Sequence, residues 1–167
     1  MTLEIPPFIR SLEARSDLLR LQTSGRSEHS FIHHNPNQRR LDVHYFFDPI
    51  KHRLMGGVYW GPDAEGPPGC GHGGSISTLM DDGMGTCAWA AGHRVVALNL
   101  NLNFKKFVPL LSWPSCEFWI EKTEGRKVFT RGELRNGEGE LHAEASGLFL
   151  EIDFTKLLNR ESHGPVA

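Results

Sequence analysis

The chain has 167 residues, of which 39% are hydrophobic and 23% are charged. A chain of this length suits a single domain, and this composition is typical of a folded protein rather than a disordered one. The formal net charge of -2 excludes a strong overall attraction to nucleic acid or to an acidic membrane. Any anionic ligand must therefore be met by a local group of basic side chains.

The cysteines and the N-terminal segment indicate the compartment of the protein. Cys70, Cys87 and Cys116 are odd in number and widely spaced, so they form no disulfide framework and fit a reducing environment. Residues 1–17 lack the apolar core of a signal peptide and contain acidic residues, which argues against a transit peptide. Because the chain has no run of about 18 apolar residues, we expect no membrane span and a cytoplasmic protein.

The N-terminal part of the chain predicts one helix and a loop. Apolar residues between positions 9 and 22 have a loose helical spacing. Residues 24–40 are polar, which indicates a loop in which His33 and His34 are solvated. Two short strands are predicted next, at 41–47 and 53–60, and a loop rich in glycine and proline follows them.

The middle of the chain predicts a long helix followed by a long strand. Apolar or small residues recur at positions 76, 79, 80, 83, 84, 87, 88 and 91, which is the spacing of one helix face, and Gly92 closes the helix. Residues 96–105 then alternate between apolar and polar side chains. This change of period predicts a strand with one apolar and one polar face.

The rest of the chain predicts strands joined by short turns. Three further strands are predicted, at residues 115–122, 127–135 and 140–152. Glu124-Gly125 joins the first two, and Asn136-Gly137 is a strong hairpin signal because both residues tolerate positive φ. Strands joined in this way are antiparallel, and one apolar helix face needs a sheet to cover it. The fold class is therefore α+β, with one antiparallel sheet curled around a long central helix.

The start of the long helix is a candidate site for a developing negative charge. The segment 69–75, Gly-Cys-Gly-His-Gly-Gly-Ser, leads directly into the helix. The first N–H groups of a helix have no internal partner and lie at the positive end of its dipole, so they can stabilise an oxyanion. The alternative is that the glycines only allow the loop and the helix to pack closely.

Two carboxylates lie on this helix at Asp81 and Asp82. On a helical wheel Asp81 lies about 110° from the centre of the apolar face, at the edge of the core, and Asp82 lies about 150° away on the other side, where it should face solvent. A carboxylate at the edge of the core is costly unless it is used or paired. Asp81 is thus a candidate catalytic group, or an ordinary boundary aspartate bonded to a neighbouring hydroxyl or amide.

Other kinds of site receive little support. Cys70 and His72 could begin a zinc site, but no second close pair of ligands follows. The chain has no Gly-x-Ser-x-Gly motif for a catalytic serine. Basic residues gather around two strand ends, where they are solvated or bind a ligand with several phosphates: Lys105, Lys106, Lys122, Arg126, Lys127 and Arg131.

Several segments together resemble a known family. The segment 65–74, with its His-Gly-Gly, followed by Asp81, resembles the hotdog-fold acyl-CoA thioesterases, which include the PaaI-like proteins. The resemblance is greatest to the group that contains thioesterase superfamily members 4 and 5. It continues through 99–105 and 124–127 and covers about residues 55–153.

The resemblance implies a fold, an activity and an assembly. It implies hydrolysis of an acyl-CoA thioester in lipid metabolism, with coenzyme A as part of the substrate and no other cofactor or metal. Two subunits would pair their sheets, as a homodimer or a dimer of dimers, with the active site at the interface. The implied division is an N-terminal helix and extension over 1–50, a hotdog core over 51–155 and a tail over 156–167.

The resemblance also implies roles for individual residues. Asp81 would act as general base on water or as nucleophile, the N–H of Gly73 would polarise the thioester carbonyl, and His72 would shape that site. The residues implied to hold the coenzyme A portion are Gly74, Asn103, Lys105, Arg126, Lys127 and Arg131.

One position departs from the family pattern. Many relatives carry Thr or Ser in the strand after the helix, where the hydroxyl helps to position water, and Ala97 stands there in this chain. This departure keeps a second hypothesis open, in which the protein binds acyl-CoA without turnover. Two other hypotheses are a thioesterase that acts on a chain attached to a carrier protein, and a hotdog dehydratase, whose expected His-plus-Glu pattern is not apparent.

Overall fold

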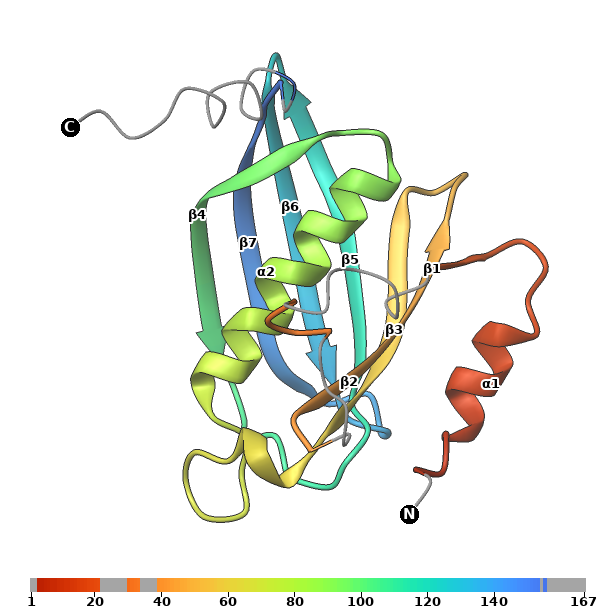
Figure 1. Ribbon diagram of the computed structural model, residues 1–167, viewed down its shortest axis with the longest axis vertical. Coiled ribbons are helices and arrows are strands. Elements are labelled where there is room, and N and C mark those ends of the chain that lie inside the picture. The colour runs from red at the N-terminus through yellow and green to blue at the C-terminus, as the bar shows by residue number, and fades with distance from the viewer. Residues whose placement is uncertain (1–2, 22–29, 34–38, 154, 156–167) are drawn as a thin grey trace.

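The computed structural model describes residues 3–21, 30–33, 39–153 and 155. The helices and strands in chain order are α1 (Pro7–Glu13), β1 (Leu19–Leu21), β2 (Leu41–Asp48), β3 (Arg53–Trp60), the short 3₁₀ helix η1 (Pro62–Ala64), α2 (Gly73–Ala90), β4 (Val95–Phe104), β5 (Ser115–Glu124), β6 (Lys127–Arg135) and β7 (Leu141–Glu151). Figure 1 shows that the strands curl around α2 as a single layer.

The sheet is antiparallel throughout. Its seven strands lie in the order β1-β2-β3-β5-β6-β7-β4. Helix α2 crosses the concave side and contacts strands from β2 to β4, while α1 packs against β2 and β3. The predicted α+β arrangement, an antiparallel sheet around a long helix, is confirmed. Within the described residues, no helix is long and apolar enough to cross a membrane.

The core lies between α2 and the sheet. The predicted apolar face of α2 is buried, with Leu79 and Met84 fully inside. The fully buried ring of Phe118 on β5 fills the space between Gly83 on α2 and Gly132 on β6. These glycines leave room for one aromatic ring between helix and sheet, which fixes how closely the two layers approach.

The predicted helix over 9–22 is too long. Helix α1 ends at Glu13, and Leu19–Leu21 instead forms strand β1, which pairs with Tyr45 to Phe47 of β2. Pairing with the open edge of the sheet gives these residues backbone hydrogen bonds that an isolated helix end lacks. Of the predicted loop 24–40, the positions 24–29 and 34–38 lie outside the described residues.

The sheet begins before residue 50, where the predicted core domain starts. Strand β2 pairs with β3 over its whole length, from Leu41 opposite Trp60 to Asp48 opposite Arg53. The division into an extension, a core and a tail stays a prediction.

Strand β4 contains a bulge that breaks the predicted apolar face. Ala97 lies opposite Phe149 and Asn99 lies opposite Leu148, so Leu98 is an extra residue. Residues directly opposite each other share a face of the sheet, and Phe149 is buried. Ala97 therefore faces α2, and the prediction of one continuous apolar face from residue 96 onward is wrong because a bulge shifts the alternation.

The hairpin between β6 and β7 is confirmed, but its turn differs from the prediction. The loop spans residues 136–140, and its positive φ of 83° occurs at Gly139 rather than at Asn136 or Gly137. Asn136 contributes through its side chain, whose Oδ1 accepts hydrogen bonds from the N–H groups of Glu138 (3.0 Å) and Glu140 (2.9 Å). This Asx-type turn needs no left-handed backbone at the asparagine.

Candidate functional site

The start of α2 leaves one backbone donor without a partner. His72 is the N-cap, and its Nδ1 accepts a hydrogen bond from the N–H of Gly74 at 2.8 Å. The N–H of Ser75 donates to the backbone oxygen of His72 at 2.9 Å. The N–H of Gly73 has no partner among the described residues. It lies in the first helical turn, where the helix dipole favours a negative ligand atom.

Close packing explains some of the glycines around this turn, but not Gly73. A Cβ at Gly71 would lie 2.5 Å from Nε1 of Trp60, and a Cβ at Gly74 would lie 2.8 Å from Nδ1 of His72. A Cβ at Gly73 would come no nearer than 3.4 Å, to the ring of Phe104. Gly73 could therefore carry a side chain, and its small size instead leaves its N–H open to a ligand.

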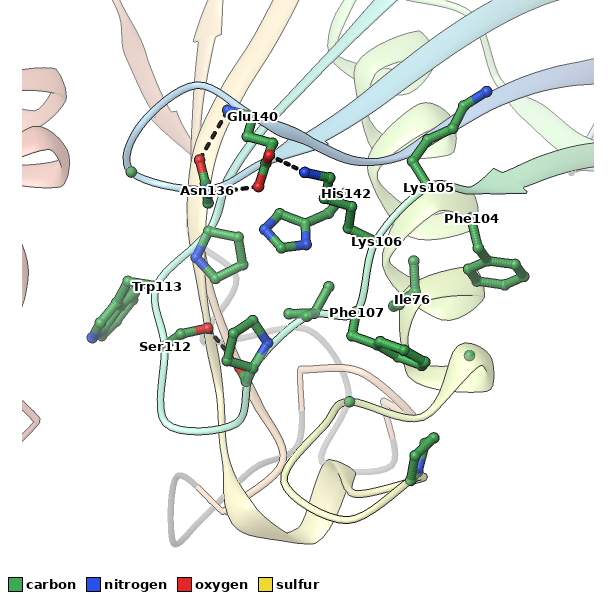
Figure 2. A pocket seen from close by; sticks show the side chains of 17 residues that line it. Ile76, Phe104, Lys105, Lys106, Phe107, Ser112, Trp113, Asn136, Glu140 and His142 are labelled. Atoms are coloured by element: carbon green, nitrogen blue, oxygen red, sulfur yellow. Dashed lines mark hydrogen bonds and ion pairs between the residues drawn. The ribbon is translucent and has the colours of Figure 1, made fainter.

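A pocket of about 870 Å³ opens next to Gly73. Figure 2 shows the wall of this pocket. The wall is formed by Ile76 of α2, the segments 104–109 and 112–114, the β6–β7 loop and His142 of β7. The side chains at its centre are mostly apolar or aromatic. A volume of this size lies within the range of small-molecule sites.

Asp81 lines a different hollow, of about 470 Å³, together with Thr86, Trp89 and Ala97. The side chain is exposed in the single chain, yet nearby protein groups remove part of its water. This desolvation, together with the negative charge of Asp82, raises the pKa of Asp81 above its ordinary value. A carboxylate with a raised pKa accepts a proton from water more readily than an ordinary one.

Asp82 is paired, so the prediction that it faces solvent is wrong. Its Oδ1 lies 3.2 Å from Nε2 of His33, and its Oδ2 accepts a hydrogen bond from the hydroxyl of Tyr45 at 3.1 Å. The side chain of His33 is only 3% exposed, so the prediction that it is solvated is also wrong. Residues 30–33 and β2 cover this side of α2, which a helical wheel of α2 alone does not show. His34 lies outside the described residues.

The predicted site residues fall into separate groups within one chain. Gly73 and Lys105 line the 870 Å³ pocket, whereas His72 and Gly74 line another hollow of about 470 Å³. Asn103 lies on β4 opposite Glu144.

The basic residues lie at both ends of the sheet. Phe104, next to Lys105, pairs with Ala143, and Lys127 pairs with Leu150. Seven residues of β7 separate these partners, which corresponds to about 23 Å along a strand. Lys105 and Lys127, which the resemblance assigned to one coenzyme A site, therefore do not meet within one chain.

Several of these cations already have partners. Nζ of Lys105 lies 2.9 Å from Glu144, and the guanidinium of Arg131 lies 3.0 Å from Glu121. Nε of Arg126 donates to the backbone oxygen of Glu151 at 3.1 Å. These contacts could not be predicted from the sequence, because the partners come from other strands.

The two buried cysteines, Cys87 and Cys116, are unsuited to catalysis. Burial raises the pKa of the Cys87 thiol to about 12 and raises that of Cys116 still further, so both stay protonated at neutral pH. Within the part of the chain that the structure describes, no group of three His, Cys, Asp or Glu side chains could hold a metal ion.

Sequence reasoning missed two residues that line these hollows. Thr86 lies in the hollow of Asp81 and provides a hydroxyl side chain there, although Ala97 does not. His142 reaches the 870 Å³ pocket from β7. Neither position stood out, because a threonine on a helix and a histidine in a strand are unremarkable until their neighbours are known.

Comparison with known proteins identifies relatives of the chain. Residues 69–143 match the family model described as the thioesterase superfamily. The acyl-coenzyme A thioesterase THEM4 of Bos taurus is 42% identical over 94 residues, which are 56% of this chain and 38% of that protein. THEM4 of Mus musculus is 37% identical over 114 residues, which are 68% of this chain and 49% of that protein. The chain thus spans half or less of the length of these curated relatives.

Solved structures share the fold. A thioesterase superfamily protein designated RHA08564 superposes with a TM-score of 0.62 at 25% identity, over 65% of this chain and 53% of that one. A hypothetical thioesterase of Streptococcus pneumoniae, solved with coenzyme A, gives a TM-score of 0.60 at 17% identity, over 67% of this chain and 88% of that one.

Proposed function

Because the chain belongs to the thioesterase superfamily and has its hotdog fold, we propose that it hydrolyses acyl-CoA thioesters. The curated relatives are named acyl-coenzyme A thioesterases, and one structural neighbour contains coenzyme A. The observation that carries the proposal is the combination of a free N–H at Gly73 with a desolvated carboxylate at Asp81. Coenzyme A would be part of the substrate, and no other cofactor would take part.

Asp81 and Gly73 have complementary roles in this proposal. The Asp81 carboxylate takes a proton from water while the water oxygen attacks the thioester carbon. The carbon–sulfur bond then breaks, and the proton on Asp81 passes to the departing sulfur to give the thiol of coenzyme A and the free acid. The alternative is that Asp81 attacks the carbon itself. In both cases the carbonyl oxygen becomes negative, and the N–H of Gly73 at the helix start stabilises it.

Two copies of the chain are needed to bring these groups together. Eight residues of α2 separate Gly73 from Asp81, which corresponds to about 12 Å along the helix axis. One carbonyl group needs both its oxyanion donor and its attacking water within hydrogen-bond reach. Within one chain, Asp81 and Gly73 accordingly line different hollows.

Strand β4 offers the surface for this pairing. It lies at one edge of the sheet, and Leu98 and Leu100 are exposed there. A long edge strand with exposed apolar side chains tends to pair with another strand. The hollow of Asp81 includes the beginning of β4, and the pocket of Gly73 includes its end, at Phe104. Antiparallel pairing of two β4 strands about a twofold axis places the beginning of one beside the end of the other.

The same pairing would assemble the site for coenzyme A. It brings Asn103 and Lys105 of one copy toward Arg126 and Lys127 of the other, which lie at opposite ends of the sheet within one chain. Cationic side chains arranged in this way suit the phosphates of coenzyme A. A cytoplasmic location, supported by the free cysteines, is also part of the proposal, as is a role in lipid metabolism.

Release of free thiol from a panel of acyl-CoAs of rising chain length tests the proposal. The wild type should turn over at least one member of the panel, and Asp81→Asn should lower kcat by at least about 100-fold. Asp82→Asn is the matched control, because it makes the same change one residue away and should keep most of the turnover. Full activity of Asp81→Asn would show that Asp81 is neither the base nor the nucleophile.

Binding without hydrolysis is the second candidate function. Ala97 favours it, because no hydroxyl at this position holds a water beside Asp81. In that case coenzyme A or acyl-CoA raises the melting temperature while no thiol appears. An acyl chain on a carrier protein is the further substrate to try if acyl-CoAs are inert.

A further inference from the structure

His142 lies in a bulge at the start of β7. Leu134 of β6 pairs with Ala143, and Arg135 pairs with Leu141, so His142 is the extra residue between them. Bulges turn a side chain away from the direction that regular alternation would give it. Here the histidine and the neighbouring Ala143 are both buried, and the histidine lines the 870 Å³ pocket beside Gly73.

The backbone holds this histidine in place. Its carbonyl oxygen accepts hydrogen bonds from the N–H groups of Lys105 (2.8 Å) and Lys106 (3.1 Å), which follow directly after β4. The bulge is thereby tied to two strands. The backbone that carries the His142 side chain is therefore held in place at the pocket wall.

The imidazole of His142 has no hydrogen-bond partner among the described residues, although the carboxylate of Glu140 lies close enough to interact with it electrostatically. The residue is only 5% exposed, and neither ring nitrogen forms a hydrogen bond within the described ranges, with Nδ1 fully buried. Figure 2 shows the ring near the middle of the lining residues, with Asn136 and Glu140 on one side and Phe107 and Ile76 on the other. A buried polar group without a partner is costly, and such a group inside a pocket commonly receives one from a ligand.

Charged groups at the rim of the pocket are already paired. Lys105 is bound to Glu144, and Lys106 is bound to Glu140, which also accepts from Nδ2 of Asn136 at 3.3 Å. If the acyl group carried a carboxylate of its own, the nearest lysines would already be paired with glutamates of the protein. A hydroxyl group both donates and accepts, so it can pair with a neutral imidazole in either tautomer.

We propose that this pocket receives an acyl group that carries an uncharged hydroxyl, and that His142 recognises the hydroxyl by a hydrogen bond. The inference rests on the proposed thioesterase function and names its substrate class. With the thioester carbonyl at Gly73, the apolar wall holds the carbon chain and His142 selects for the oxygen on it. The hydroxyl lies along the chain, away from the thioester.

Matched substrate pairs test the proposal. Thiol release is compared for octanoyl-CoA and for hydroxyoctanoyl-CoAs whose hydroxyl is moved from carbon to carbon. At one position the wild type should prefer the hydroxylated chain in kcat/KM by at least about tenfold. His142→Phe should abolish that preference, so that the ratio of kcat/KM between the hydroxylated chain and octanoyl-CoA falls to about one. No preference at any position in the wild type overturns the proposal.

Two further variants separate recognition from packing. His142→Gln keeps a donor and an acceptor and should retain part of the preference. Phe107→Leu changes an apolar part of the same wall, so it should alter both substrates by a similar factor and leave their ratio unchanged. A preference that His142→Phe leaves intact, or that Phe107→Leu abolishes, contradicts the role of the imidazole.

Binding distinguishes this inference from the proposed function. Stable thioether analogues of the same chains are titrated by calorimetry into the wild type and into His142→Phe. If no thioester is hydrolysed but the wild type still binds the hydroxylated analogue more tightly, the hydrolase assignment fails and the recognition by His142 stands. If both analogues bind equally, the recognition fails whatever the turnover.

Discussion

The hydroxyl of Tyr45 donates a 3.1 Å hydrogen bond to the carboxylate of Asp82, one residue from Asp81. With His33 on the other oxygen, this bond holds a second negative charge beside the proposed base. The charge of Asp82 is one of the two causes that raise the pKa of Asp81, and desolvation is the larger. The pairing of Asp82 with β2 therefore bears directly on the chemistry of its neighbour.

The pH profile of hydrolysis should respond to Asp82. Asp81 acts as a base only when deprotonated, so kcat/KM should fall as the pH drops through its raised pKa. Asp82→Asn removes the neighbouring charge, which should lower that pKa and move the acid limb of the profile to lower pH. Glu138→Gln, an exposed loop change of equal charge, should not move it. An acid limb that stays in place in Asp82→Asn would show that the charge does not act on the base.

Gly73→Ala should abolish the proposed hydrolysis without unfolding the protein. The added methyl group has room beside Phe104, but it would stand next to the N–H that we propose as the donor to the carbonyl oxygen. Loss of an oxyanion donor commonly costs about 100-fold or more in kcat. Gly137→Ala adds the same methyl group elsewhere in this pocket, where nothing lies within 4 Å, and should have little effect. Kinetics and melting temperatures of both variants are compared, and unchanged kcat in Gly73→Ala would remove this donor from the mechanism.

Mixed dimers should recover activity from two inactive variants. If Asp81 of one copy works with Gly73 of the other, a dimer of an Asp81→Asn copy and a Gly73→Ala copy has one intact site. Random exchange of equal amounts should then restore about a quarter of the wild-type activity, since half of the dimers are mixed and each has one of two sites. Sites contained within one chain would give no recovery after the two proteins are unfolded and refolded together.

Ala97→Thr should raise kcat. Ala97 is exposed and lines the hollow of Asp81, so a threonine hydroxyl fits there and can hold the attacking water. The measurement is thiol release at saturating substrate, with Ala97→Val as a control of the same shape without the hydroxyl. An increase in both variants would indicate packing rather than positioning of water, and no increase in either would mean that another group already holds it.

Gly83→Ala should destabilise the protein, although alanine is the better helix former. A Cβ at Gly83 would lie 2.2 Å from the ring of Phe118, which is fully buried and cannot move aside. Overpacking of this kind costs about 1–3 kcal/mol. Gly85→Ala on the same helix meets Phe149 only at 3.5 Å and should be neutral or stabilising by up to about 1 kcal/mol. Denaturant unfolding of the two variants checks the contrast, and equal stabilities would contradict it.

The sequence by itself determined the elements that local chemistry controls. The spacing of apolar residues along α2 and the alternation along the strands predicted the central helix and the strands from β2 to β7, and the short turns predicted that these strands are antiparallel. The resemblance carried by His72, Gly73 and Asp81 predicted a thioesterase, and residues 69–143 match the model of the thioesterase superfamily. These features depend on residues close together in the chain, because helix and strand periods and short turns are local properties.

Tertiary structure alone decided how distant segments meet. The wheel of α2 could not show that His33 and Tyr45 cover Asp82, since they come from residues 30–33 and from β2. Alternation could not reveal the bulges that turn Ala97 toward α2 and His142 into the pocket, because a bulge is defined by the register of a partner strand. The sequence likewise could not show that Gly73 and Asp81, which lie on one helix, line two different hollows. This separation is the reason for proposing that a second chain completes the site.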